Sequence, residues 1–109
     1  MNAIADGIQV QENIREIVFE AIDELNQEIP QEKQLEKTAD TPLLSKSGKI
    51  DSLGLVRLIV AIEQKIEEIF GDAIMLADEK AFAQKDSPFK TVGTLINYIF
   101  MLLGADLDE

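Results

Sequence analysis

Apolar residues recur at intervals of three and four along most of this 109-residue chain, which is the spacing of one buried face of an amphipathic helix. The first such segment runs from about Gln11 to Ile29, and Pro30 ends it. Its apolar stripe consists of Ile14, Ile17, Val18, Ala21, Ile22 and Leu25. We therefore expect a first helix here, with an acidic opposite face.

A long connection follows Pro30 before the next apolar pattern begins. It spans about 20 residues, whereas connections beyond about 12–15 residues are uncommon in compact domains and usually serve a function or are disordered. Its apolar anchors are Leu35, Leu43, Leu44 and Ile50. We expect this loop to cross the fold instead of closing a tight hairpin.

The second helix is predicted from Ser52 to Phe70, and Gly71 is suited to the left-handed residue that ends a helix. The expected buried stripe of this helix comprises Val56, Ile59, Ile62, Ile66, Ile69 and Phe70. Asp78 is then expected to cap a short third helix over about Glu79 to Gln84, in which Phe82 points inward.

The last helix is predicted to begin at Thr91, after Ser87 and Pro88 interrupt the chain. Its expected buried residues are Val92, Leu95, Ile96, Ile99 and either Leu102 or Leu103. We expect Gly104 to end this helix, so that the acidic residues after it form a short tail.

These elements predict an all-α fold, because the chain has no alternation typical of strands and each helix has one apolar stripe to bury. We expect a small antiparallel bundle of three long helices plus one short helix, with a long first loop. The predicted organisation is a short N-terminal segment over residues 1–9, one domain over 10–104 and an acidic tail over 105–109.

The amino-acid composition excludes several classes of partner and of catalytic site. The chain carries 21 acidic and 10 basic residues, a net charge of −11, which repels nucleic acid and anionic membrane surfaces and favours partners with basic patches. It has no cysteine and no histidine, so a disulfide, a thiolate metal site, a cysteine nucleophile and a Ser-His-Asp triad are all excluded. Most hydrolase mechanisms are therefore excluded.

Targeting and ligand motifs are also missing from the sequence. The start, "MNAIADGIQV", lacks the features of a signal peptide, and no segment has the roughly 20 apolar residues of a membrane span. The stretch "SKSGKI" fails as a phosphate-binding loop because Leu43 and Ile50 occupy positions that require Gly and Ser or Thr. No EF-hand pattern occurs. We expect a cytoplasmic, monomeric protein.

The stretch "GKIDSLGLVRLIVAIE" contains the main candidate for chemistry. Asp51 and Ser52 precede the second helix, where such residues usually act as N-caps, but neither has the Glu or Gln three positions later that completes a capping box. Gly54 in the first turn costs about 1 kcal/mol relative to Ala. A hydroxyl at this positive helix end also suits a phosphodiester, which unpaired amides and the helix dipole stabilise.

The segment "DSLGLVRLIVAIE" resembles the prosthetic-group attachment motif of acyl carrier proteins. The order of the surrounding segments follows the same family: "TPLL" in the long loop, "IFG" at the end of the second helix, "AIML", and "TVGTLINYI" in the last helix. The resemblance covers the chain from about Val10 to Gly104.

By this resemblance, Ser52 would receive 4′-phosphopantetheine from coenzyme A through a separate magnesium-dependent phosphopantetheinyl transferase. The thiol of the arm would then carry acyl groups as thioesters, and the carrier itself would catalyse nothing. Asp51 would help to position the serine or the transferase's metal, and Leu53 and Val60 would be exposed contacts for partner enzymes. For both residues the alternative is core packing, above all for Val60, because it lies beside the predicted buried stripe.

The resemblance also implies a cleft for the acyl chain and a charged surface for partners. The cleft residues would be Val56, Ile59, Ile62, Phe82, Val92 and Ile96. Carriers of fatty acid synthesis usually have acidic residues where this second helix has Gly54 and Arg57, and Lys65 dilutes its negative field further. The acidic residues that remain to meet basic partners are Glu63, Glu67 and Glu68.

These implications favour a carrier in a specialised lipid, polyketide or related biosynthetic pathway. Its expected partners are the transferase and acyl-loading and acyl-transferring enzymes with basic patches. The alternative is an unmodified acidic helical adaptor that binds a basic protein partner through its surface alone.

Overall fold

The computed structural model describes residues 3–43, 50–71, 73–76 and 87–107, and this part of the chain is all-helical, with helices that pack together. Its elements are α1 (Ala3–Asn26), the 3-10 turn η1 (Gln31–Lys33), α2 (Ser52–Phe70) and α4 (Val92–Leu107). β pairing within the described residues is limited to one isolated bridge between Pro42 and Thr91. The prediction of an all-α fold is confirmed.

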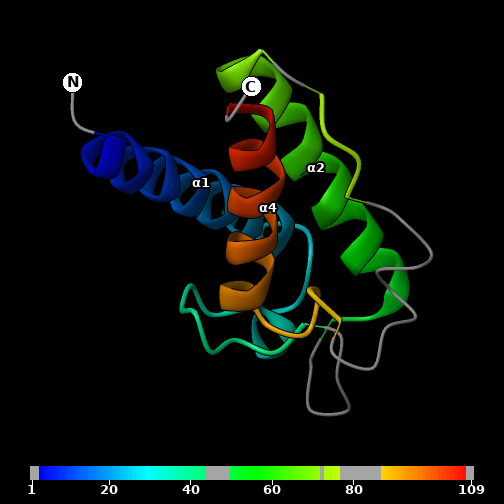
Figure 1. Ribbon diagram of the computed structural model, residues 1–109. Helices are drawn as coiled ribbons and strands as arrows, with labels where there is room; N and C mark the ends of the chain where they lie inside the picture. The colour runs from blue at the N-terminus through cyan, green and yellow to red at the C-terminus, as the bar shows by residue number, and fades with distance from the viewer. Residues whose placement is uncertain (1–2, 44–49, 72, 77–86, 108–109) are drawn as a thin grey trace.

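The helices cross instead of forming a simple antiparallel bundle. α2 and α4 rise in the same direction in Figure 1, and α1 crosses behind α4 and packs against both. A parallel pair is possible because the chain between Phe70 and Thr91 is long enough to return to the lower end of α2. The predicted short helix at residues 79–84, with Phe82, lies outside the described residues.

α1 is longer at its N-terminus than the apolar pattern predicted. It begins at Ala3 and not near Gln11, so residues 3–9 of the expected lead-in segment are helical. Ala3 and Ala5 have high helix propensity, and Val10 is half-buried against the core, which extends the apolar stripe backwards. All six residues of the predicted stripe between Ile14 and Leu25 are buried, as expected.

α2 has the predicted bounds, but its buried face is rotated from the predicted one. The residues of α2 that are buried are Leu55, Leu58, Ile59, Ile62 and Ile66. Val56 and Ile69 were predicted to be buried and are 43% and 57% exposed. Residues 53–62 are so rich in apolar side chains that two helical faces fit the pattern, and packing against α1 and α4 selects between them. Gly71 ends the helix at a φ of 77°, which confirms the predicted left-handed cap.

α4 begins with a reciprocal cap made by two threonines. The Thr94 amide donates to Thr91 Oγ1 at 3.1 Å, and the Thr91 amide donates to Thr94 Oγ1 at 3.0 Å, the arrangement of a capping box. The prediction that Gly104 ends this helix is wrong, because α4 continues to Leu107 and Gly104 has no positive φ. The apolar run through Leu103, which is buried, holds the helix past a glycine that costs about 1 kcal/mol.

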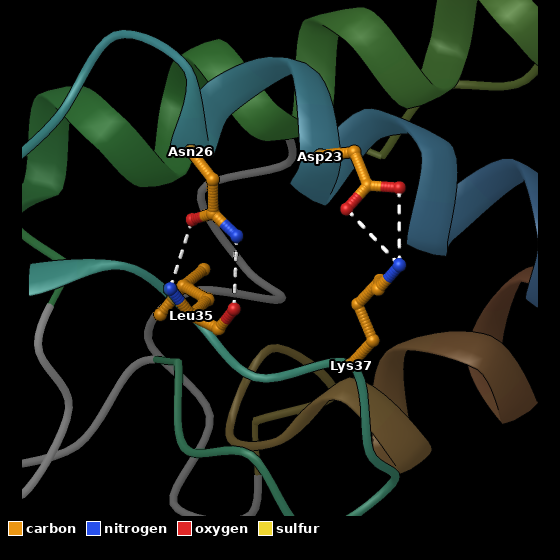
Figure 2. A network of polar contacts seen from close by, with 4 residues as sticks. All are labelled: Asp23, Asn26, Leu35 and Lys37. Atoms are coloured by element: carbon orange, nitrogen blue, oxygen red, sulfur yellow. Dashed lines mark hydrogen bonds and ion pairs between the residues drawn. The ribbon is translucent and has the colours of Figure 1, made fainter. Parts of the chain in front are cut away.

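The loop after α1 is fastened to α1 by side chains. Figure 2 shows the Asn26 side chain pairing with both backbone groups of Leu35: Oδ1 accepts from the amide at 2.8 Å, and Nδ2 donates to the carbonyl at 2.9 Å. Lys37 Nζ lies 3.2 Å from the carboxylate of Asp23. The Leu35 and Leu43 side chains are buried, as their role of apolar anchors requires.

The same loop also caps α4. The carbonyl oxygens of Ala39 and Thr41 accept hydrogen bonds from the amides of Gly93 and Val92 at 2.8 and 3.0 Å. A Cβ at residue 93 would lie 2.9 Å from the Ala39 oxygen, so only glycine permits this approach. The loop therefore links the end of α1 to the start of α4.

Candidate functional site

The N-terminus of α2 separates the capping residue from the candidate attachment residue. Asp51 is the N-cap, with an extended backbone, and its Oδ1 accepts from the Gly54 amide at 2.7 Å. Ser52 is the first residue of the helix. Because the cap bond belongs to the aspartate, the fold does not require Ser52 as the cap.

Gly54 has a steric role at this helix end. A Cβ on residue 54 would lie 2.9 Å from Ile50 Cγ1 and 3.1 Å from Asp51 Oδ1. Ile50 is itself half-buried against the core. The glycine therefore lets Ile50 and the capping carboxylate pack against the first turn of α2.

Three apolar side chains project from α2 on the side opposite its buried residues. Leu53, Val56 and Val60 are spaced at three and four residues, and we call them the outer face of α2. Leu53 is 69% exposed and Val60 is 41% exposed, so both are available as contacts. Met75 is also exposed, and it lines a hollow together with Val60. The sequence pattern did not predict Val56 and Met75 as exposed contacts: Val56 was expected to be buried, and Met75 was not singled out.

The two cations of α2 pair with carboxylates of α1 and of the turn that follows it. Arg57 forms an ion pair with Glu28, and Lys65 Nζ lies 2.7 Å from Glu24 and 3.5 Å from Glu20. The sequence alone suggested that Arg57 and Lys65 weaken the negative field of α2 toward partners. Lys65 lies at the contact between α1 and α2, whereas the pair of Arg57 with Glu28 is about half exposed to solvent.

Lys65 has an electrostatic environment that favours its charged form. Its side chain is 18% exposed. The hydrogen bond to Glu24 raises the pKa of Lys65 above the ordinary value of 10.5, against the opposing effect of burial, and the charges of Glu24 and Glu20 raise it further. The lysine is a fixed positive charge between two carboxylates at neutral pH.

The acidic residues of α2 divide into two groups. The Glu63 carboxylate accepts a hydrogen bond from the Leu76 amide at 2.6 Å, so it secures the segment that follows α2. Glu67 and Glu68 are exposed. Of the three glutamates expected to meet basic partners, the last two have the solvent exposure that this role requires.

Most residues of the predicted acyl cleft belong to the packed core. Ile59, Ile62 and Val92 have no exposed surface, and Ile96 is almost fully buried. Val56 lies on the outer face of α2, so its assignment to the cleft is wrong. Phe82 lies outside the described residues. The buried members line one core shared by the three helices.

Two further observations concern metal binding and membrane crossing by the described residues. Its acidic residues do not form a group of three or more that is arranged to hold a metal ion. None of the helices in residues 3–107 that the structure describes combines the length and the apolar character needed to cross a membrane.

No protein family, curated protein or solved structure matches this chain. The resemblance to acyl carrier proteins therefore rests on the residues around Ser52 and on the order of the surrounding segments.

Proposed function

We propose that the chain is an acyl carrier protein that holds acyl groups on a 4′-phosphopantetheine arm attached to Ser52. The observation that carries the proposal is the start of α2, where Asp51 caps the helix and Ser52 and the exposed Leu53 follow. A serine in the first turn, next to the capping aspartate and followed by an exposed apolar residue, suits modification by another protein.

The residues at this helix end fit a phosphodiester. The first helical hydrogen bond runs from the Leu55 amide to the Asp51 carbonyl at 2.9 Å, and the Gly54 amide bonds to the Asp51 carboxylate. The amides of Ser52 and Leu53 precede these bonds, at the positive end of the helix dipole. They are the groups that would stabilise the phosphate of the arm.

The proposed attachment step transfers the phosphopantetheine group from coenzyme A to Ser52. The Ser52 hydroxyl forms a bond to the phosphorus of the pantetheine arm in coenzyme A, the pyrophosphate bond breaks, and adenosine 3′,5′-bisphosphate leaves. The serine proton passes to a base of the transferase, since this chain has no histidine. Once attached, the arm supplies a thiol for thioester formation.

The chain's own side chains would bind the partner enzymes that act on the acyl group. The outer face of α2 offers apolar contacts beside Ser52, and Glu67 and Glu68 add negative charge for basic patches. Arg57 pairs with Glu28, which offsets part of its positive charge but leaves it about half exposed. We propose a specialised lipid, polyketide or related pathway, because Gly54 and Arg57 depart from the usual fatty-acid carriers.

Incubation with coenzyme A, magnesium and a broad-specificity phosphopantetheinyl transferase tests the proposal by intact-protein mass spectrometry. We expect one added phosphopantetheine, which Ser52→Ala abolishes and which Ser45→Ala and Ser47→Ala retain. Leu53→Ser should slow the reaction while the far-ultraviolet circular dichroism stays unchanged.

A chain that remains unmodified under these conditions contradicts the carrier proposal. An acidic adaptor would then be the better assignment, because the outer face of α2 and its carboxylates serve protein binding without the arm. Retained labelling in Ser52→Ala would also contradict the choice of residue.

A further inference from the structure

A hollow of about 390 Å³ lies where the outer side of α1 approaches the first turns of α4. Its volume falls in the range of about 300–1,000 Å³ that is typical of small-molecule pockets. The lining residues are Ile8, Gln11, Glu12, Arg15, Phe19, Ala39, Gly93, Ile96 and Asn97. None of them belongs to α2, so the hollow is separate from Ser52 and from the outer face.

The apolar part of this hollow is recessed. Ile96 is 7% exposed and Phe19 is half-buried, whereas Ile8 is an exposed residue of the lining. The contact between Gly93 and Ala39 described above closes one side. A narrow ligand reaches such a recessed surface, while the flat surface of a protein partner does not.

Arg15 supplies a positive charge at the same place. Its guanidinium carbon lies 5.2 Å from the centre of the Phe19 ring, which is a cation–π contact. Among the residues that the structure describes, Arg15 makes no ion pair, unlike Lys37, Arg57 and Lys65. Its planar donors remain available for a carboxylate, which an arginine binds with two parallel hydrogen bonds.

We propose that this hollow binds a small amphipathic monocarboxylate, with its carboxylate on Arg15 and its apolar body against Phe19 and Ile96. The amide side chains of Gln11 and Asn97 also line the hollow and offer further donors. The net charge of −11 does not prevent this contact, because distant carboxylates are screened beyond about 8 Å at physiological ionic strength.

Glu12 gives the site a built-in opposing charge. It lines the hollow three residues before Arg15 and forms no ion pair with it. A bound carboxylate therefore meets attraction from Arg15 and repulsion from Glu12. Neutralising the two residues changes the affinity in opposite directions, which a nonspecific apolar interaction would not do.

Titration of the full-length isotopically labelled chain with octanoate, octanol and octylammonium tests the proposal by NMR. Octanoate is expected to shift the signals of Ile8, Phe19 and Ile96 and to bind more tightly than the other two probes. Arg15→Gln should weaken octanoate binding about fivefold, and Glu12→Gln should strengthen it. Lys33→Gln removes an exposed cation outside the hollow and should leave it unchanged.

Ile8→Ser is an additional variant that changes only an exposed apolar residue of the lining, and it should also weaken binding. Ser52→Ala should bind octanoate with the affinity of the parent. The test of the hollow is therefore independent of the carrier proposal. Tighter binding of octylammonium, or equal affinities for Arg15→Gln and Lys33→Gln, would overturn the proposal. Shifts of these signals that depend on protein concentration alone would identify a second copy of the chain as the occupant.

Discussion

Asn26 offers a direct test of whether side chains hold the long loop in place. Asn26→Ala removes both hydrogen bonds to Leu35, at 2.8 and 2.9 Å, and leaves two part-buried backbone groups without these partners. Each such bond contributes about 0.5–1.5 kcal/mol net, so the free energy of unfolding should fall by about 1–3 kcal/mol. For a domain of this size, each kcal/mol corresponds to about 4 °C in Tm.

Asn13→Ala is the matched control, because Asn13 lies in the same helix and makes only an exposed side-chain bond to Gln9. Both substitutions replace asparagine by alanine, but Asn26 is the last residue of α1 and gains less helix propensity than Asn13, by at most about 0.7 kcal/mol, so only a larger difference is assigned to the loop bonds. Urea denaturation followed by circular dichroism measures both variants. If Asn26→Ala is no less stable than Asn13→Ala, the two bonds to Leu35 do not stabilise the fold.

Five further substitutions test three other local assignments. Lys65→Gln should lower the stability at pH 7 by about 1 kcal/mol. The raised pKa of Lys65 means that its contribution is complete below pH 10.5 and is lost as the pH rises through the folded-state pKa, so the difference from the parent in urea midpoint should shrink above that pH. Gly104→Ala should stabilise the fold by about 0.5–1 kcal/mol, whereas Gly71→Ala should destabilise it because of the positive φ; opposite shifts in Tm check this pair, and a shared sign would contradict it. Asp51→Ala should cost about 1 kcal/mol by removing the cap, while Ser52→Ala should stay within about 0.5 kcal/mol of the parent in the same denaturation assay, and equal losses would show that the cap is shared.

The sequence predicted the buried face of a helix correctly where its apolar residues form a single stripe. In α1, the polar residues between Ile14 and Leu25 leave a single apolar stripe, and that stripe is buried. In α2, apolar residues occupy most positions from Leu53 to Ile62, so periodicity alone did not distinguish Val56 from Leu55. The buried face of that helix depends on where α1 crosses it, which no local pattern encodes.

The candidate site was predicted in part for a similar reason. The position of Ser52 at the start of α2 follows from the cap and the apolar run, both of which are local. The pairing of Arg57 with Glu28 joins residues far apart in the chain, and it appears only when the helices are packed. A search for cations on α2 that face the glutamates spaced four apart along α1 and the turn after it would have suggested it.

The division of roles between Asp51 and Ser52 has an evolutionary consequence. Because the cap bond comes from the aspartate, a codon change at residue 52 removes the hydroxyl without removing the support of the helix. Under the carrier proposal, the cap does not preserve the serine, and selection on the modification would have to do so. A gene duplicate relieved of carrier duty would lose the attachment residue early and still encode a stable chain with an intact outer face.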